Sequence, residues 1–136
     1  MSGTAHSAGL VQLNPSTVAP PIGRYSHGML VPAHSRLLFV SGQVGLDGDQ
    51  LVSGGVAEET RQALTNLSAV LATEGASLTD VVKTTVFLRH MRDFKLMNEA
   101  YVEVMGDHRP ARSAVAVVEL PAVALIEVEA VAYKPA

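Results

Sequence analysis

Apolar positions recur along the chain with helical spacing in two stretches. The first lies between Gly55 and Gly75, where apolar side chains return every three or four residues and predict a helix. A second helix is expected from about residue 93 to residue 105. The expected buried face of the first helix is Val56, Thr60, Ala63, Leu64, Leu67, Val70 and Leu71, and that of the second is Phe94, Met97, Tyr101, Val104 and Met105.

Shorter apolar stretches, rich in β-branched residues, predict strands. They cover residues 25–31, 37–45, 81–89, 112–120 and 125–133, with turns at 47–50 and at Pro121. The order is strand, strand, helix, strand, helix, strand, strand. It predicts an α+β fold in which two helices pack on one face of a mixed sheet.

The last predicted strand has two different faces. Ile126, Val128, Ala130 and Ala132 share an apolar face that suits packing under the helices. Leu125, Glu127, Glu129, Val131 and Tyr133 form a mixed face on the other side. Because two helices can cover only one side of the sheet, the mixed face is expected to contact another subunit, with Glu127 at or near the boundary.

Composition narrows the picture further. The 136 residues are enough for one domain, 1–136, in which the Ser-, Gly- and Pro-rich residues 1–20 are expected to be loosely held, with 9–13 as a short edge strand. Hydrophobic residues make up 48% of the chain and charged residues only 17%, which favours an oligomer. The absence of cysteine excludes disulfides and thiolate chemistry, and the five histidines lack metal-ligand spacing.

Charge and targeting signals favour a cytoplasmic protein. The net charge is −3 and no long Lys/Arg cluster is present, which counts against nucleic acid as a partner. The first 18 residues lack the basic and apolar regions of a secretory signal. No apolar run approaches membrane-spanning length, so no membrane association is expected.

Arg112 is the residue that most strongly indicates a function. It opens the apolar run Ala114–Val118, and no acidic residue lies between it and Glu119. A permanent cation at the start of an apolar strand is costly unless an anion meets it. That anion could be Glu127 or Glu129 in a structural pair, a group on another chain, or a bound carboxylate.

Six segments together resemble the reactive intermediate deaminase family (Rid, or YjgF-type) from about residue 20 onward. They are Ile22-Gly23-Arg24-Tyr25, Val40-Ser41-Gly42-Gln43-Val44, Val82-Lys83-Thr84-Thr85-Val86-Phe87, Asp93-Phe94 with Asn98 and Tyr101, Pro110-Ala111-Arg112-Ser113, and Ile126-Glu127-Val128-Glu129-Ala130. The resemblance implies a chorismate-mutase-like fold and a homotrimer with ligand sites between subunits. It also implies cofactor-free hydrolysis of enamines and imines, such as 2-aminoacrylate, to 2-keto acids and ammonia.

The resemblance also implies roles for individual residues. Arg112 would bind the substrate carboxylate, and Glu127 would orient the attacking water, with Glu129 as the rival candidate. Tyr25 could donate a hydrogen bond to substrate or water, or serve only in packing. Ser41 and Gly42 would line the cleft where the strand loosens, or form a β-bulge, while Asn98 would support the pocket. Phe94 and Tyr101 are expected in the core.

Departures from the family pattern leave alternatives open. Arg24 stands where the family often has Pro, His27 where it has a glutamine-like residue, and Ala114 where it often has Cys. Arg109 competes with Arg112 as the arginine that meets the ligand, although Pro110 places it in the preceding loop. The functional alternatives are a trimer that binds a small carboxylate without turnover, an RNA-directed ribonuclease or translation inhibitor, and a deaminase for a larger imine.

Overall fold

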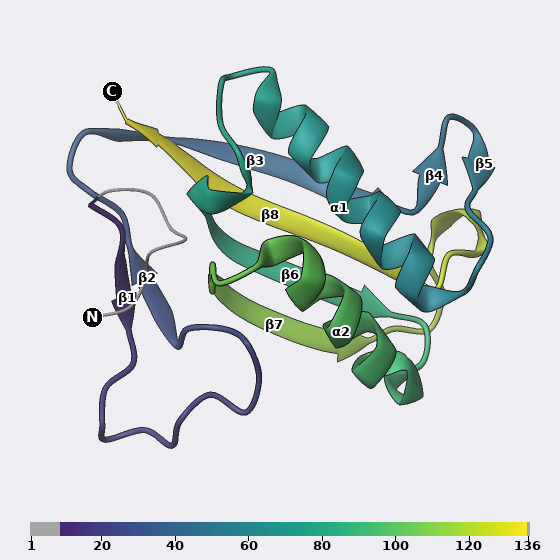
Figure 1. Ribbon diagram of the computed structural model, residues 1–136, viewed down its shortest axis with the longest axis horizontal. Helices are drawn as coiled ribbons and strands as arrows, with labels where there is room; N and C mark the ends of the chain where they lie inside the picture. The colour runs from purple at the N-terminus through teal and green to yellow at the C-terminus, as the bar shows by residue number, and fades with distance from the viewer. Residues whose placement is uncertain (1–8, 136) are drawn as a thin grey trace.

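The computed structural model describes residues 9–135 and centres on a four-stranded sheet with both helices on one face (Figure 1). The helices are α1 (Val56–Ala72) and α2 (Phe94–Met105). The strands are β1 (Val11–Leu13), β2 (Gly28–Leu30), β3 (Ser35–Val44), β4 (Leu46–Asp47), β5 (Gln50–Leu51), β6 (Val81–Leu88), β7 (Ala111–Ala116) and β8 (Ile126–Pro135). The expected α+β fold is therefore confirmed. Residues 1–8 of the expected N-terminal segment lie outside the described residues.

The main sheet has the order β3-β8-β6-β7. Strand β8 runs antiparallel to both β3 and β6, whereas β6 and β7 are parallel. Parallel neighbours need a crossover connection, and α2 supplies it between β6 and β7. This arrangement makes β7 an edge strand, so Arg112 opens a strand at the rim of the sheet rather than one buried at its centre.

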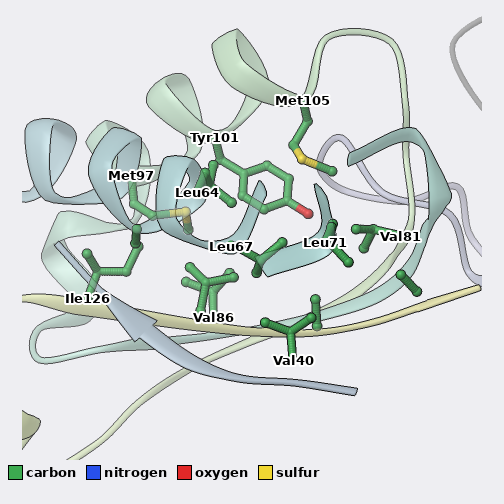
Figure 2. Close-up of a cluster of buried hydrophobic side chains, with 14 of the residues drawn as sticks. Val40, Leu64, Leu67, Leu71, Val81, Val86, Met97, Tyr101, Met105 and Ile126 are labelled. Carbon is green, nitrogen blue, oxygen red and sulfur yellow. The ribbon is translucent and has the colours of Figure 1, made fainter. Parts of the chain in front are cut away.

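The hydrophobic core fills the space between the two helices and the sheet (Figure 2). Helix α1 contributes Leu64, Leu67 and Leu71, and α2 contributes Met97, Tyr101 and Met105. The buried faces predicted for the two helices are largely confirmed, because these positions recur at helical spacing and face the sheet. Val70 is the exception, since 42% of its surface is exposed and it lies beside the stripe rather than in it.

The two faces of β8 differ as predicted. Ile126, Val128, Ala130 and Ala132 are buried under the helices. On the other side Glu129 is exposed and Glu127 is half-buried. Tyr133 lies on the same side as Glu127 and Glu129, opposite Leu37 of β3, but is wholly buried.

Apolar side chains remain exposed on the sheet face opposite the helices. Phe39 pairs with Val131, Leu37 with Tyr133, and Val115 with Phe87 across neighbouring strands. Phe39 is 75% exposed, Leu37 51% and Val115 44%. Single exposed apolar residues are ordinary, but a group on one sheet face is typical of a surface that another element covers.

Two predicted strands are shorter than expected. In the stretch 25–31 only β2 is a strand, because its partner β1 has just three residues, and Tyr25 lies in the loop before it. The stretch 112–120 ends as a strand at Ala116, where its neighbour β6 also ends, at Leu88. The edge strand expected at 9–13 is confirmed as β1, which pairs with β2 in a separate small sheet beside the main one (Figure 1).

Two features are absent from residues 9–135. No helix in this part of the chain has the length and apolar character needed to cross a membrane. Nor do three histidine, aspartate or glutamate side chains gather there in a group that could hold a metal ion.

Candidate functional site around Arg112

The register of β7 places Arg112 on the side of the sheet that carries the helices. Arg112 lies directly opposite Thr84 of β6, and Thr84 is buried under α2, where its hydroxyl is 2.8 Å from the Tyr101 hydroxyl. From this position an Arg112 Nη1–H donates a hydrogen bond of 2.7 Å to the Asn98 Oδ1 of α2. Asn98, which was expected to support the pocket, therefore contacts the Arg112 guanidinium directly.

Three aromatic rings surround the Arg112 guanidinium. Its Cζ lies 4.8 Å from the ring centre of Tyr101 and 5.6 Å from the centres of Tyr25 and Phe94. At these distances the negative face of an aromatic ring attracts a cation. The bond between Thr84 and Tyr101 fixes the nearest ring, so the guanidinium is held by a rigid part of the core.

The charge of Arg112 has no acidic partner in the described part of the chain. Burial lowers the pKa of the Arg112 guanidinium, because removal from water disfavours the charged form. An arginine nevertheless stays protonated near neutral pH, since its ordinary pKa lies far above neutrality. None of the ion pairs among residues 9–135 involves Arg112, so the structural pair with Glu127 or Glu129 is not formed within the chain.

A cavity of about 190 Å³ lies beside the guanidinium. Its lining consists of Ile22, Gly23, Tyr25, Phe94, Arg112 and Ala114. The guanidinium carries five N–H donors, and Asn98 is its one hydrogen-bond acceptor within the described residues. The other donors are available to a planar anion such as a carboxylate, which an arginine binds through two parallel hydrogen bonds.

Glu127 lies on the other face of the sheet, against Gly42. It is opposite Phe87 of β6, between the buried residues Val86 and Leu88, and therefore points away from the helices. The register of β3 shifts between Val40 and Gln43, which confirms a β-bulge at Ser41 and Gly42. A Cβ atom at position 42 would overlap the Glu127 carboxylate, so the carboxylate can occupy this position only because Gly42 has no side chain.

A second hollow, of about 260 Å³, lies on this helix-free face. Its lining includes Ser41, Lys83, Thr85 and Glu129 together with the exposed ring of Phe39. Ser41 and the rival carboxylate Glu129 therefore belong to this hollow, and neither lines the Arg112 cavity.

The predicted site residues thus form two groups separated by the sheet. Arg112, Asn98 and Tyr25 come together on the helix side, whereas Glu127, Gly42 and Ser41 lie on the helix-free side. Strand β6 lies between β7, which carries Arg112, and β8, which carries Glu127. Within one chain, the guanidinium of Arg112 and the carboxylate of Glu127 cannot meet the same small ligand.

Three neighbouring basic residues, Arg109, Arg24 and His27, lie outside the cavity. The Arg109 side chain is exposed, and its backbone carbonyl accepts a hydrogen bond of 2.5 Å from the Ser26 hydroxyl. This leaves Arg112 as the arginine of the cavity. Arg24 is exposed, and the His27 ring nitrogen Nε2 lies 2.7 Å from the Ala19 carbonyl oxygen.

The role of Phe94 and Tyr101 beside Arg112 was missed at the level of the sequence. Tyr101 is buried in the core as expected, and Phe94 packs against the core, yet both rings also face the guanidinium. Their spacing gave a usable signal, because Phe94, Asn98 and Tyr101 follow one another at i, i+4 and i+7 and share one face of α2.

Comparison with known proteins places this arrangement in a family. Residues 16–134 match the family model described as endoribonuclease L-PSP. The chain is 46% identical over 116 residues to a RutC family protein of Pyrococcus horikoshii (84% of this chain, 90% of the relative). It is also 46% identical over 123 residues to human 2-iminobutanoate/2-iminopropanoate deaminase, covering 88% of each chain.

A solved structure agrees with these matches. The crystal structure of YyfB from Yersinia pestis, a protein of the Rid family, superposes with a TM-score of 0.76 and 30% identity. The alignment covers 91% of this chain and 98% of YyfB. The matched family model and these relatives span nearly the whole described chain, and the chain therefore belongs to the Rid family.

Proposed function

We propose that this protein hydrolyses small 2-imino acids, and the enamines in equilibrium with them, to 2-keto acids and ammonia. The observation that carries the proposal is the half-buried Arg112 guanidinium, which faces a cavity and has no acidic partner among the described residues. Such a group is suited to a small carboxylate, because charge-assisted hydrogen bonds offset the cost of burying the cation. The similarity to 2-iminobutanoate/2-iminopropanoate deaminases supports the choice of substrate.

The proposed reaction needs a bound carboxylate, a positioned water and a group that carries a proton. Arg112 holds the substrate carboxylate, and the protonated imine nitrogen makes the neighbouring carbon electrophilic. Water adds to that carbon while the Glu127 carboxylate accepts one water proton, giving a carbinolamine. Glu127 returns the proton to the nitrogen, the carbon–nitrogen bond breaks, and the departing ammonia takes the hydroxyl proton. The products are a 2-keto acid and ammonium, and no cofactor is required.

We further propose that the cleft forms between copies of the chain in a homotrimer. One copy would supply Arg112, Tyr25 and Asn98, and its neighbour would supply Glu127, Gly42 and Ser41. Two observations support this assembly. The two groups lie on opposite faces of one sheet, and Phe39, Leu37 and Val115 leave the helix-free face apolar and exposed.

The direct test generates 2-aminoacrylate in situ with a serine dehydratase and follows release of the keto acid. The wild-type chain should accelerate release over the spontaneous reaction. Arg112→Ala should reduce the acceleration by about 100-fold or more, because the carboxylate then loses its bidentate partner. Arg109→Ala is the matched control and should retain activity, since its side chain lies outside the cavity. A wild-type chain that adds nothing to spontaneous hydrolysis would rule out this substrate.

The description of the matched family as an endoribonuclease favours one second candidate, cleavage of RNA. The net charge of −3 weighs against it, because non-specific RNA binding depends on basic residues that neutralise phosphates. RNA cleavage that persists at high salt and disappears in Arg112→Ala would support this candidate over the deaminase.

A further inference from the structure

Ala114 lies at the wall of the Arg112 cavity, two residues farther along β7. It pairs with Val86 of β6 just as Arg112 pairs with Thr84, so both residues face the helix side of the sheet. Successive residues on one face of a strand are spaced roughly 7 Å apart along it. A ligand whose carboxylate binds the guanidinium can therefore extend its tail toward the Ala114 methyl group.

The remainder of the lining is uncharged. Ile22, Phe94 and Ala114 are apolar, Gly23 has no side chain, and Tyr25 presents an aromatic ring to the cavity. Arg112 is the one charged residue among the six that line it. A charge on the ligand's tail would lose its water without gaining a partner from these six residues, whereas an aliphatic tail would gain by burial.

We propose that Ala114 determines the length of the aliphatic tail that the site accepts. This inference rests on the proposed deaminase function and names the substrate class within it: 2-imino acids with uncharged aliphatic tails, up to at least six carbons in total. With only a methyl group at position 114, the cavity wall leaves room for such a tail. A larger side chain there would occupy the same space and restrict the site to imines of three or four carbons.

The test compares a short and a long imine with the same reacting groups. A D-amino-acid oxidase produces 2-iminopropanoate from D-alanine and 2-iminohexanoate from D-norleucine, and semicarbazide traps the imine that escapes hydrolysis. In Ala114→Val, kcat/KM for the six-carbon imine should fall at least tenfold relative to wild type. For the three-carbon imine it should stay within about threefold. A single methylene misplaced in an apolar pocket alters selectivity by about tenfold or more, which sets the size of the expected difference.

Ala116→Val is the matched control. Ala116 lies on the same face of β7, opposite Leu88, but outside the cavity lining. Ala116→Val should leave the ratio of the two kcat/KM values unchanged. Any general loss of activity caused by a larger side chain in this strand should appear equally with both imines. If Ala114→Val lowers both substrates equally, or neither, Ala114 does not determine tail length.

Failure of this inference can be distinguished from failure of the proposed function. If the wild-type chain hydrolyses neither imine, deamination fails, and calorimetry with pyruvate and 2-oxohexanoate still tests the cavity. Ala114→Val should then weaken binding of 2-oxohexanoate at least tenfold more than binding of pyruvate, and equal effects would overturn the inference. Should Ala114→Val not fold, Ala114→Gly provides the opposite test. It should raise kcat/KM for the six-carbon imine relative to the three-carbon imine, or the affinity for 2-oxohexanoate relative to pyruvate.

Discussion

The Asn98 side chain gives Arg112 a neutral hydrogen-bond acceptor. Replacing Asn98 by a charged residue tests whether the guanidinium binds the substrate carboxylate. In Asn98→Asp the new carboxylate would stand where the amide oxygen now lies, 2.7 Å from Nη1. It would neutralise Arg112 and compete with the substrate carboxylate, because a close opposite charge satisfies the cation. We expect KM for a 2-imino acid to rise by about tenfold or more, with thermal stability unchanged or higher.

Asn98→Ala is the comparison that separates charge from loss of positioning. It removes the acceptor without adding an anion, so the guanidinium stays available to substrate but is held less firmly. Its loss of kcat/KM should therefore be smaller than that of Asn98→Asp, and steady-state kinetics with both variants measure the difference. Equal losses in the two variants would mean that Asn98 acts by shape alone and that no substrate anion competes at Arg112.

Gly42 permits a separate test on the helix-free face. A methyl group at this position would overlap the Glu127 carboxylate, which lies at the end of a flexible side chain and can move away. Gly42→Ala should therefore cost less than about 1 kcal/mol of unfolding free energy, yet reduce kcat at least tenfold, because the displaced Glu127 carboxylate could not perform its proposed role of holding water in place. Chemical denaturation and initial rates on the same preparation measure the two quantities.

Gly45 offers the structural counterpart to Gly42. A Cβ atom there would lie 2.7 Å from the Glu59 Cα and 2.9 Å from its carbonyl oxygen, which are backbone atoms of α1 and cannot move aside. Gly45→Ala should cost about 1–3 kcal/mol of unfolding free energy, the usual range for overpacking. If Gly42→Ala destabilises the protein as much as Gly45→Ala while sparing activity, Gly42 serves only the bulge.

At the level of elements, Glu59 joins α1 to the start of β8. Its side chain is almost fully buried, and its Oε1 accepts a hydrogen bond of 2.8 Å from the Leu125 N–H, just before β8 begins. Burial raises the pKa of the Glu59 carboxyl; the Leu125 hydrogen bond partly opposes this, and the negative charge of Asp93 adds to it. The folded chain therefore binds the Glu59 proton more tightly than the unfolded chain does.

This pKa shift predicts how stability depends on pH. Between the ordinary glutamate pKa and the raised value, the folded state holds more protons, so the Glu59 contribution to stability falls as pH rises. Glu59→Gln removes the titration while its side-chain oxygen can still accept from Leu125. The unfolding free energy of the variant relative to wild type should thus increase from about pH 4 to about pH 8 in denaturation experiments. A relative free energy that decreases over this range would contradict the assignment.

The elements also show how far the sequence could predict this molecule. Helix α1 could be recognised because its apolar stripe is continuous from Val56 to Leu71, a property of the local sequence. The end of β7 at Ala116 could not, because it depends on where β6 stops rather than on residues 117–120. The approach of Tyr25 to Arg112 depends likewise on tertiary structure: Ser26 bridges to Ala111, which brings the loop before β2 to the edge of the sheet.

For the whole molecule, the central question is how Arg112 and Glu127 could serve one reaction from opposite faces of a sheet. Individually, each residue had a chemical rationale in the sequence. Their relative placement depended on strand order and register, which bring Arg112 under α2 and turn Glu127 away from it. In the proposed trimer, a second copy on the helix-free face brings the two residues together, and Phe39, 75% exposed on that face, is a suitable contact for it.

Mixing two inactive variants tests this arrangement directly. Arg112→Ala and Glu127→Gln should each be inactive as pure proteins. If each cleft takes Arg112 from one copy and Glu127 from the next, random reassociation of equal amounts after denaturation and refolding leaves about one cleft in four with both native residues. The mixture should recover about a quarter of wild-type activity, and separately refolded samples combined without exchange should recover none. Absence of recovery, with mixed oligomers demonstrated by mass spectrometry of a tagged copy, would rule out a cleft shared between copies, and activity in pure Glu127→Gln would remove Glu127 from the reaction.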